Sequence, residues 1–468
     1  MTIRLMATAL AVAVLAGCAS TPPPKSGGTA SARPYSFTDD PYPSTYQRIA
    51  SPPVLIAGAT VLTGDGARIE GGDVLMRDGA IVAVGTALDA PADAVRVDGR
   101  GKWVTPGIID VHSHLGVYAS PGVNAHSDGN EANAPVTAQV WAEHSVWPQD
   151  PGFDTARAGG VTALQILPGS ANLIGGRGVT LKNVPATTYQ GMKFPGAPWG
   201  LKMACGENPK RVYGSKGGPS TRMGNIAGFR AAFADAAEYR KKRQKSQDSD
   251  KDSGGKRDLK LDSLAGAING DILIHNHCYR ADEMAIMLDL AKEFGFRIAA
   301  FHHGVEAYKV ADRLAAAGTC GALWADWWGF KMESFDGIQE NIALVDRAPG
   351  GCAIVHSDSD EGIQRLNQEA AKVMANAQRV GISIAPEHAI RWITQNPAKA
   401  MGILEQTGTL EAGKMADVVL WSGNPFSSYA QAEQVYVDGA RMYDRRDPAR
   451  QPKSDFMLGQ DLMRGGVR

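Results

Sequence analysis

Two histidines stand one residue apart in the segment Asp110-Val111-His112-Ser113-His114, which continues a short apolar run. Side chains two apart on a β-strand point to the same side, so the imidazoles of His112 and His114 converge on one point. Two neutral imidazoles are good ligands for a zinc-class ion. The same pair also suits a buried, hydrogen-bonded arrangement, so the surrounding elements must decide between the two interpretations.

Eight apolar runs in the middle of the chain predict strands, and they alternate with helical patterns such as residues 281–294 and 306–317. This spacing is typical of repeated βα units. We place the strands near residues 108–111, 161–167, 179–182, 200–204, 271–275, 297–301, 321–324 and 352–355, the third having the weakest pattern. The predicted fold is α/β, a (β/α)8 TIM-type barrel with His112 and His114 at the mouth where the strands end.

The two ends of the chain share short apolar runs separated by Gly and Asp turns, in residues 51–104 and 404–450. This texture is typical of antiparallel strands, and we expect both ends to form one small β-sandwich domain. Residues 105–403 then make the barrel, and residues 451–468 a tail. Residues 241–258 are rich in charge, Ser and Gly without an apolar period, which favours a solvated, mobile insertion over a partner-binding arm.

Two segments resemble sequence signatures of the amidohydrolase superfamily: Val-Thr-Pro-Gly-Ile-Ile-Asp at 104–110 and Gly-Thr-Leu-Glu-Ala-Gly-Lys-Met-Ala-Asp at 408–417. Within that superfamily the chain resembles the imidazolonepropionase-like branch, over residues 53–439. The branch includes metal-dependent dipeptidases that cleave Xaa-Pro or basic dipeptides. The resemblance implies a TIM-type barrel and a metal-dependent hydrolase acting on carbon–nitrogen bonds.

The resemblance also implies metal ligands at later strand ends. The His-x-Tyr pattern of strand five matches His-Cys-Tyr at 277–279, which makes His277 the ligand and His275 its competitor. The strand-six pattern, a His just before Gly, matches His303 and leaves His302 as a structural neighbour.

An acidic residue on strand eight and a bridging residue on strand four complete the implied site. The strand-eight pattern matches Asp358, with Asp360 as second choice. Dipeptidases of this branch bridge two metals with a carboxylated lysine on strand four, which Lys202 resembles. Glu207 is the alternative bridge, because other members of the superfamily use a Glu and this sequence departs from the branch around that residue.

These ligands imply two Zn²⁺ ions about 3.5–4 Å apart that share a hydroxide, which attacks an amide carbonyl. A site with a single ion, and Mn²⁺ or Co²⁺ in place of Zn²⁺, are the alternatives. Asp358 is then both ligand and catalytic proton shuttle to the leaving nitrogen. Deaminating and ring-opening relatives usually carry a Glu three residues after the strand-five His. Here that position is Arg280, which favours amide cleavage.

Two residues are predicted to bind substrate. Residues 173–178 resemble a Gly-Gly-His-Gly loop of related dipeptidases in which Arg177 replaces the histidine. Arg177 and the Tyr279 hydroxyl are expected to bind an α-carboxylate, unless Arg177 only braces its loop. The predicted function is a dipeptidase-like or N-acyl amino acid hydrolase. A lactonase, a deaminase and a non-catalytic metal-binding lipoprotein are the alternatives.

The first residues predict export. Arg4, the apolar run 5–15 and Leu-Ala-Gly-Cys at 15–18 resemble a bacterial lipoprotein signal peptide with Cys18 as the lipidated residue, and a plain signal peptide is the alternative. Ala19 favours the outer membrane, so the expected location is the periplasmic face of the cell envelope. Residues 19–50 are expected to form a flexible tether.

The composition excludes other classes of partner. The chain is 44% hydrophobic and 21% charged with a net charge of −1, which gives no field for nucleic acid. A small amide substrate and a lipid anchor are the expected partners, and a homo-oligomer stays open. The other four cysteines are scattered singly, which predicts neither disulfides nor a thiolate zinc site.

Overall fold

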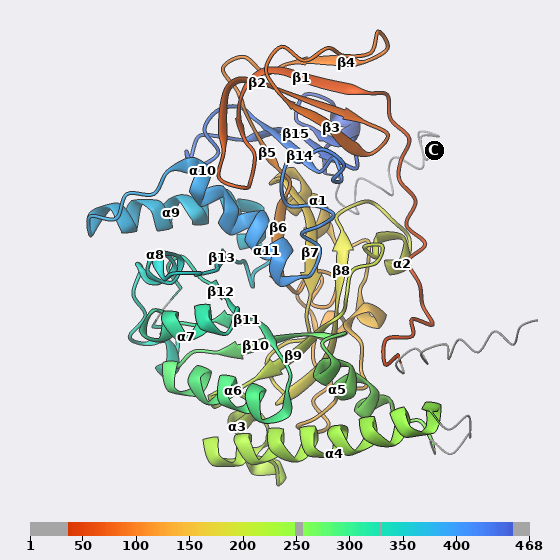
Figure 1. Cartoon of the computed structure of the whole chain (residues 1–468), viewed down its shortest axis with the longest axis vertical. Coiled ribbons are helices and arrows are strands. Elements are labelled where there is room, and N and C mark those ends of the chain that lie inside the picture. Colours follow the sequence, from red (N-terminus) through yellow and green to blue (C-terminus); the bar gives the residue numbers. More distant parts are fainter. Residues whose placement is uncertain (1–35, 249–255, 328, 453–468) are drawn as a thin grey trace, which may run out of the picture. The chain divides into compact units, whose positions relative to one another are not determined.

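The strands expected to carry the chemistry form one eight-stranded sheet in the computed structural model, which describes residues 36–248, 256–327 and 329–452. The strands follow one another in chain order around a barrel (Figure 1). They are β6 (Ile108–Ser113), β7 (Val161–Ile166), β8 (Ile174–Lys182), β9 (Gly200–Ala204), β10 (Leu273–Cys278), β11 (Ile298–His303), β12 (Cys320–Leu323) and β13 (Ala353–Val355). The gap between β13 and β6 is bridged where the Asp358 N–H donates to the His112 carbonyl at 3.1 Å. The predicted TIM-type barrel is confirmed.

One strand departs from the βα repeat. β8 runs antiparallel to both β7 and β9, whereas the other neighbouring strands in the barrel are parallel. Parallel strands need a crossover of a dozen or more residues. The link from β7 to β8 spans only residues 167–173, so β8 returns beside β7 directly. β8 contains residues 179–182, the predicted strand with the weakest sequence pattern.

Helices cover the outside of the barrel and begin and end at local signals. The Asp258 carboxylate accepts hydrogen bonds from the first N–H groups of α5, and Gly270 ends that helix in the left-handed region at φ 84°. Gly295 ends α6 in the same way at φ 77°. The helices are α1 (Pro151–Ala158), α2 (Tyr189–Met192), α3 (Glu207–Tyr213), α4 (Arg222–Asp248), α5 (Leu259–Asn269), α6 (Ala281–Phe294), α7 (Ala311–Ala316), α8 (Asn341–Arg347), α9 (Leu366–Arg379), α10 (Pro386–Ala389) and α11 (Gln395–Ala400).

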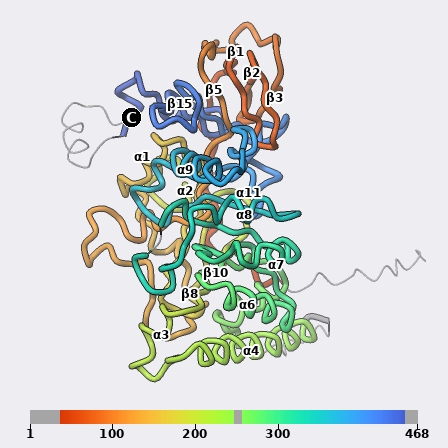
Figure 2. The backbone as a smooth tube through the Cα atoms, turned by 90° about the vertical axis from the view of Figure 1, so that its left-hand side faces the viewer, coloured from red at the N-terminus to blue at the C-terminus, as the bar shows by residue number. Residues whose placement is uncertain are grey.

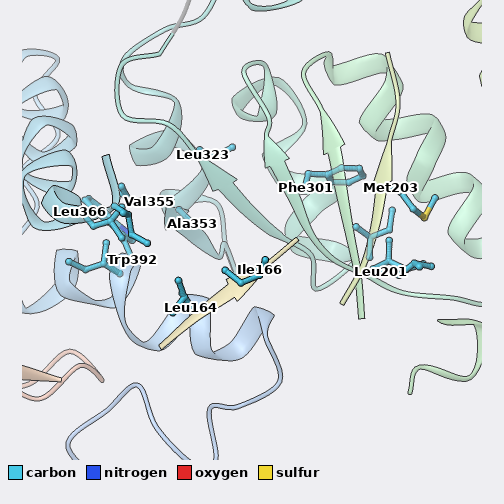
Figure 3. Close-up of a cluster of buried hydrophobic side chains, with 14 of the residues drawn as sticks. Leu164, Ile166, Leu201, Met203, Phe301, Leu323, Ala353, Val355, Leu366 and Trp392 are labelled. Carbon is cyan, nitrogen blue, oxygen red and sulfur yellow. The ribbon is translucent and has the colours of Figure 1, made fainter. Parts of the chain in front are cut away.

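The main hydrophobic core fills the space between strands and helices. Leu201 and Met203 of β9 and Phe301 of β11 belong to it, as do Leu366 of α9 and Trp392 (Figure 3). Because side chains alternate along a strand, the residues between these core positions face the barrel interior. This alternation places Lys202 and His302 inside the barrel.

A second sheet unites the two ends of the chain, as predicted. Its strands are β1 (Val54–Leu62), β2 (Arg68–Arg77), β3 (Ala80–Gly85), β4 (Val95–Asp98), β5 (Trp103–Pro106), β14 (Val418–Trp421), β15 (Ala432–Val437) and β16 (Ala440–Asp444). The order is β16-β15-β14-β5-β1-β2-β3, with β4 on β1. β5 and β14 pair antiparallel, with Val104 opposite Leu420. The early strands, orange, and the late strands, blue, therefore lie in one part of the molecule (Figure 2).

The expected tether is wrong for residues 36–50, which lie against the barrel and the second sheet. Phe37 is buried, and Lys193 forms an ion pair with Asp40 at 2.9 Å. The Tyr46 hydroxyl donates to Asp438 at 2.5 Å. The segment is extended and has no periodic apolar pattern. Single side chains hold it against the rest of the protein, and its amino-acid composition alone does not predict such contacts.

Two further expectations are corrected. Residues 241–248 continue α4 instead of starting an irregular insertion, because Lys, Arg and Gln are good helix formers. Cysteines expected to be unpaired form the disulfides Cys205–Cys278 and Cys320–Cys352. The partners are 73 and 32 residues apart, and only the pairing of β9 with β10 and of β12 with β13 brings them together.

The predicted signal peptide with Cys18 lies outside the described residues, as do residues 19–35, 249–255 and 453–468. Within the described ranges, no helix is long and apolar enough to cross a membrane.

Candidate metal centre

His112 and His114 converge with Asp358 at the mouth of the barrel. The two Nε2 atoms are 3.3 Å apart, and Asp358 Oδ1 lies 3.3 Å from His112 Nε2 and 3.1 Å from His114 Nε2. Ligand atoms about 2.0–2.1 Å from a tetrahedral zinc ion lie about 3.3 Å from one another. The spacing of these three atoms therefore fits a single divalent ion.

The closure of the barrel brings Asp358 to the two histidines. Ser357 donates through its N–H, at 3.2 Å, and its hydroxyl to the buried carboxylate of Asp110, two residues before His112. Asp358 itself has φ 51°, a left-handed backbone that Asp adopts more readily than most residues. These contacts direct the Asp358 carboxylate back toward β6.

Lys202, the predicted bridging residue, is buried beside this group, with Nζ 3.2 Å from His112 Nε2. Burial lowers its pKa to about 8, against the opposing charge of Asp358. This lower pKa raises the neutral fraction at pH 7 to about a tenth, far above that of an ordinary lysine, and the neutral amine is the form that carbon dioxide carboxylates. The alternative bridge, Glu207, faces Lys331 at 3.8 Å and is 30% exposed. Of the two candidates, the structure brings only Lys202 to the site.

His303 faces the second oxygen of Asp358, and His277 packs against His303. Their rings are 4.7 Å apart, and His303 Nδ1 is 3.7 Å from Asp358 Oδ2. His277 Nδ1 is buried without a hydrogen-bond partner among the described residues, as expected for a nitrogen reserved for a ligand. The two oxygens of Asp358 thus face two different histidine groups, an arrangement that suits two neighbouring cations.

The competing histidines, His275 and His302, form a support beneath the site. His302 Nδ1 is 2.9 Å from His112 Nδ1, and His302 Nε2 is 2.9 Å from His275 Nδ1. Hydrogen bonds to the far nitrogen of a ligating histidine fix its orientation and tautomer. His302 therefore positions His112, and His275 in turn holds His302. Asp360, the second choice for strand eight, is not among the clustered residues.

Sequence reasoning missed His356. Its Nε2 lies 3.1 Å from His303 Nδ1, and it can form a second metal-binding group with His112 and His302. The available signal was its spacing of two residues from Asp358. Trp324 stacks on His356 at 5.5 Å and lies 4.2 Å from the His303 ring, so an aromatic side chain borders these two histidines.

The cluster has the charge state that metal binding requires. Burial lowers the pKa of His112, His277 and His303 well below the ordinary value, which keeps their nitrogens free of protons. Burial lowers the pKa of His356 to about 4. For Asp358, burial alone would raise the pKa, but the hydrogen bond and charge of His114 outweigh it and the pKa falls. Neutral imidazoles and a carboxylate anion are the ligand forms for zinc.

The prediction that Arg177 binds substrate is wrong. In the antiparallel β8–β9 pair Arg177 lies opposite Leu201, whose side chain faces outward, so Arg177 also points away from the barrel interior. It is 1% exposed, donates to Ser263 Oγ at 2.8 Å, and stacks on Trp141 at 4.5 Å. The guanidinium braces the fold.

Tyr279 does lie at the site. Its ring packs edge-on against His277 at 4.6 Å and is largely buried. Arg280 occupies the position where deaminating relatives carry an acid, and it pairs with Asp282 at 2.9 Å on the surface.

Known proteins share this architecture. The amidohydrolase family model matches residues 353–447. An amidohydrolase structure from Thermotoga maritima is 36% identical with a TM-score of 0.77, and the match covers 84% of this chain and 100% of that one. The chain belongs to the amidohydrolase family. The sequence-based expectation of a hydrolase from this family is confirmed.

Two further proteins with different names are similar to this amidohydrolase. Amidohydrolase tasK from Hapsidospora irregularis is 33% identical over 411 residues, which is 80% of this chain but only 40% of that protein. An imidazolonepropionase from Mesorhizobium japonicum is 26% identical over 387 residues, covering 75% of this chain and 87% of the relative. The family is thus shown, while the substrate is a separate question.

Proposed function

We propose that this amidohydrolase uses two divalent metal ions to hydrolyse the amide bond of small substrates, either dipeptides or N-acyl amino acids. The observation that carries the proposal is the position of Asp358, with Oδ1 toward His112 and His114 and Oδ2 toward His303. A carboxylate in this place can serve two cations. Lys202 lies beside His112, and once carboxylated it would provide a further anionic ligand for the metal ions.

When bound, a pair of Zn²⁺ ions, or Mn²⁺ or Co²⁺, would supply an activated water and polarise the substrate carbonyl. His112 and His114 would hold one ion with Asp358, and His277 and His303 the other. The buried imidazoles need no proton loss before they bind, because burial keeps them neutral. His302 keeps the His112 ring oriented through the 2.9 Å contact at its far nitrogen.

Asp358 is the proposed acid and base. Its carboxylate is anionic at neutral pH and its side chain is 21% exposed, so it can reach substrate while still contacting the histidines. It would accept the proton of the attacking water and release it to the leaving nitrogen. Trp324, which packs against His303 and His356, would shield one side of this transfer from water.

Amide cleavage is favoured over deamination and ring opening by Arg280. The position where those enzymes carry a carboxylic acid holds a guanidinium that is engaged with Asp282 on the surface. The relative named imidazolonepropionase makes ring opening the second candidate. Both candidates use the same metal ligands and differ in the acid that serves the substrate.

The test is reconstitution of metal-free protein with Zn²⁺, Mn²⁺ or Co²⁺, followed by assay of dipeptides, N-acyl amino acids, lactones and an imidazolone. We expect metal-dependent release of amino acids, lost in Asp358→Asn while the circular dichroism spectrum is retained. Turnover of lactones or the imidazolone alone would contradict the amide assignment. An active, metal-free preparation would contradict the metal assignment.

A further inference from the structure

The loop after β12 half-buries Lys331 and exposes several of its apolar side chains. The Lys331 side chain is 25% exposed. Its neighbours Phe330 and Met332 are 56% and 80% exposed, and Phe335 is 66% exposed. Lysines are normally among the most exposed residues, and withdrawing an ammonium group from water is costly. The loop thus exposes apolar side chains and partly withdraws the Lys331 ammonium group from water. This pattern indicates that the ammonium group has a function at its position that offsets the cost of its desolvation.

The Lys331 ammonium group contacts two residues that pack against the proposed metal ligand His277. Nζ is 4.4 Å from the centre of the Tyr279 ring, which packs on His277, and 3.2 Å from Asn208 Oδ1. The Asn208 amide nitrogen is in turn 3.5 Å from His277 Nε2. Lys331, Asn208 and Tyr279 therefore border the histidine at the substrate side of the barrel mouth.

The backbone of Lys331 is held in place by the turn that follows it. Ser334, in the short helix η5 (Met332–Ser334), donates to the Lys331 carbonyl through its N–H at 3.1 Å and its hydroxyl at 3.0 Å. Glu333 accepts a hydrogen bond from the Glu207 N–H at 2.9 Å and pairs with Arg222. The loop thus fixes Lys331 relative to α3 and α4.

Lys331 has no close carboxylate partner among the described residues. Its ion pair with Glu207 Oε1 is 3.8 Å long, beyond hydrogen-bond distance. A cation this near to metal ligands is repelled by a bound metal, unless an anion lies between them. A substrate carboxylate would satisfy both charges at once, and it would find a hydrogen-bonding ammonium group, an amide and a phenol in one place.

We propose that Lys331, with Asn208 and Tyr279, binds the α-carboxylate on the leaving-group side of the substrate and so makes the enzyme selective for substrates with a free C-terminal carboxylate. This inference rests on the proposed amide hydrolysis. An α-carboxylate is separated from the scissile nitrogen by one carbon atom, so its binding group must lie close to the metal site. Lys331 contacts Asn208 and Tyr279, and both of these pack against the proposed ligand His277. Arg177, on the outward face of β8, has no such contact.

The experiment compares a dipeptide with the same dipeptide carrying a C-terminal carboxamide, using metal-loaded wild type, Lys331→Met and Lys331→Arg. We expect the ratio of kcat/KM for the acid over the amide to fall about 10- to 100-fold in Lys331→Met, through KM rather than kcat. Lys331→Arg should recover part of the ratio. Lys309→Met is the matched control, since Lys309 pairs closely with Glu306 and Asp336 and should keep the ratio.

A binding measurement keeps the two proposals separable. Calorimetry of N-acetyl-L-alanine and N-acetyl-L-alaninamide with the zinc-loaded protein should show a preference for the acid that Lys331→Met removes. An unchanged preference in the folded variant would overturn the role of Lys331, whether or not the protein hydrolyses peptides. If wild type hydrolyses neither peptide but binds the acid through Lys331, the proposed reaction fails and the carboxylate site stands.

Discussion

Two lysines buried on neighbouring strands of the barrel have opposite surroundings. Lys182, on β8, has Nζ 2.9 Å from Asp438 Oδ1 and 3.7 Å from Asp417 Oδ1, both in the second sheet domain. Lys202, on β9, faces His112 Nε2 at 3.2 Å and forms no ion pair with a carboxylate in the described part of the chain. A buried charge with matched partners holds a fold together, whereas an unmatched one beside imidazoles indicates chemistry.

The largest effect expected from this comparison is that of Lys202→Gln. Removing the bridge should lower kcat about 10³- to 10⁴-fold, because a metal centre contributes several kcal/mol of transition-state stabilisation. The free energy of unfolding should stay the same or rise, since a buried ammonium group without an ion pair is lost. Steady-state kinetics and urea unfolding of one preparation measure both. Partial rescue of Lys202→Gln by acetate, a free carboxylate, would support Lys202 as the carboxylated ligand. Full activity of the variant without acetate would contradict this role.

Lys182→Met should have the reverse profile. It leaves Asp417 and Asp438 buried without their cation, which should cost about 3–5 kcal/mol of folding free energy. The activity of the molecules that remain folded should be close to that of wild type, because Lys182 does not contact the metal ligands. Urea unfolding and kcat at a permissive temperature test this, and a stable but inactive variant would contradict it.

The cost of Lys182→Met should also depend on pH. Burial raises the pKa of Asp417, and the charge of Lys182 opposes that rise. A carboxyl group whose folded-state pKa is raised favours folding below that pKa and loses this contribution as pH increases. Without Lys182 the pKa rises further, so the variant should be closest to wild type near pH 5 and furthest near pH 8. Unfolding curves at both values give the comparison.

The smallest expected effect concerns a third buried cation, Arg177. Arg177→Met removes the stacking on Trp141 and the hydrogen bond to Ser263, and should destabilise the fold by about 1–3 kcal/mol. KM for a substrate with a free carboxylate should not change, since the guanidinium faces away from the barrel interior. A large rise in KM without loss of stability would return Arg177 to the substrate site.

Patterns within short segments predicted much of the fold and site. Eight apolar runs located the barrel strands, and spacing by two predicted the convergence of His112 and His114. The resemblance to a family then placed His277, His303 and Asp358 at later strand ends, where the structure brings them together.

Features that depend on the direction and register of strands could not be predicted. Arg177 faces outward because the β8–β9 register places it opposite the outward-facing Leu201, and a one-residue change in register would turn it to the other face. The disulfide Cys205–Cys278 depends on the β9–β10 pairing. The position of Lys331 is set by a loop that exposes its apolar side chains, whereas apolar side chains are usually buried.

The central claim is that Lys202, Asp358 and the four histidines His112, His114, His277 and His303 hold two metal ions. The most direct test is the metal content of the purified protein after reconstitution with Zn²⁺ and bicarbonate and removal of free metal, measured by mass spectrometry. The account predicts two zinc ions per chain in wild type and fewer in Lys202→Gln. One ion or none in wild type, with the same value in Lys202→Gln, would contradict it.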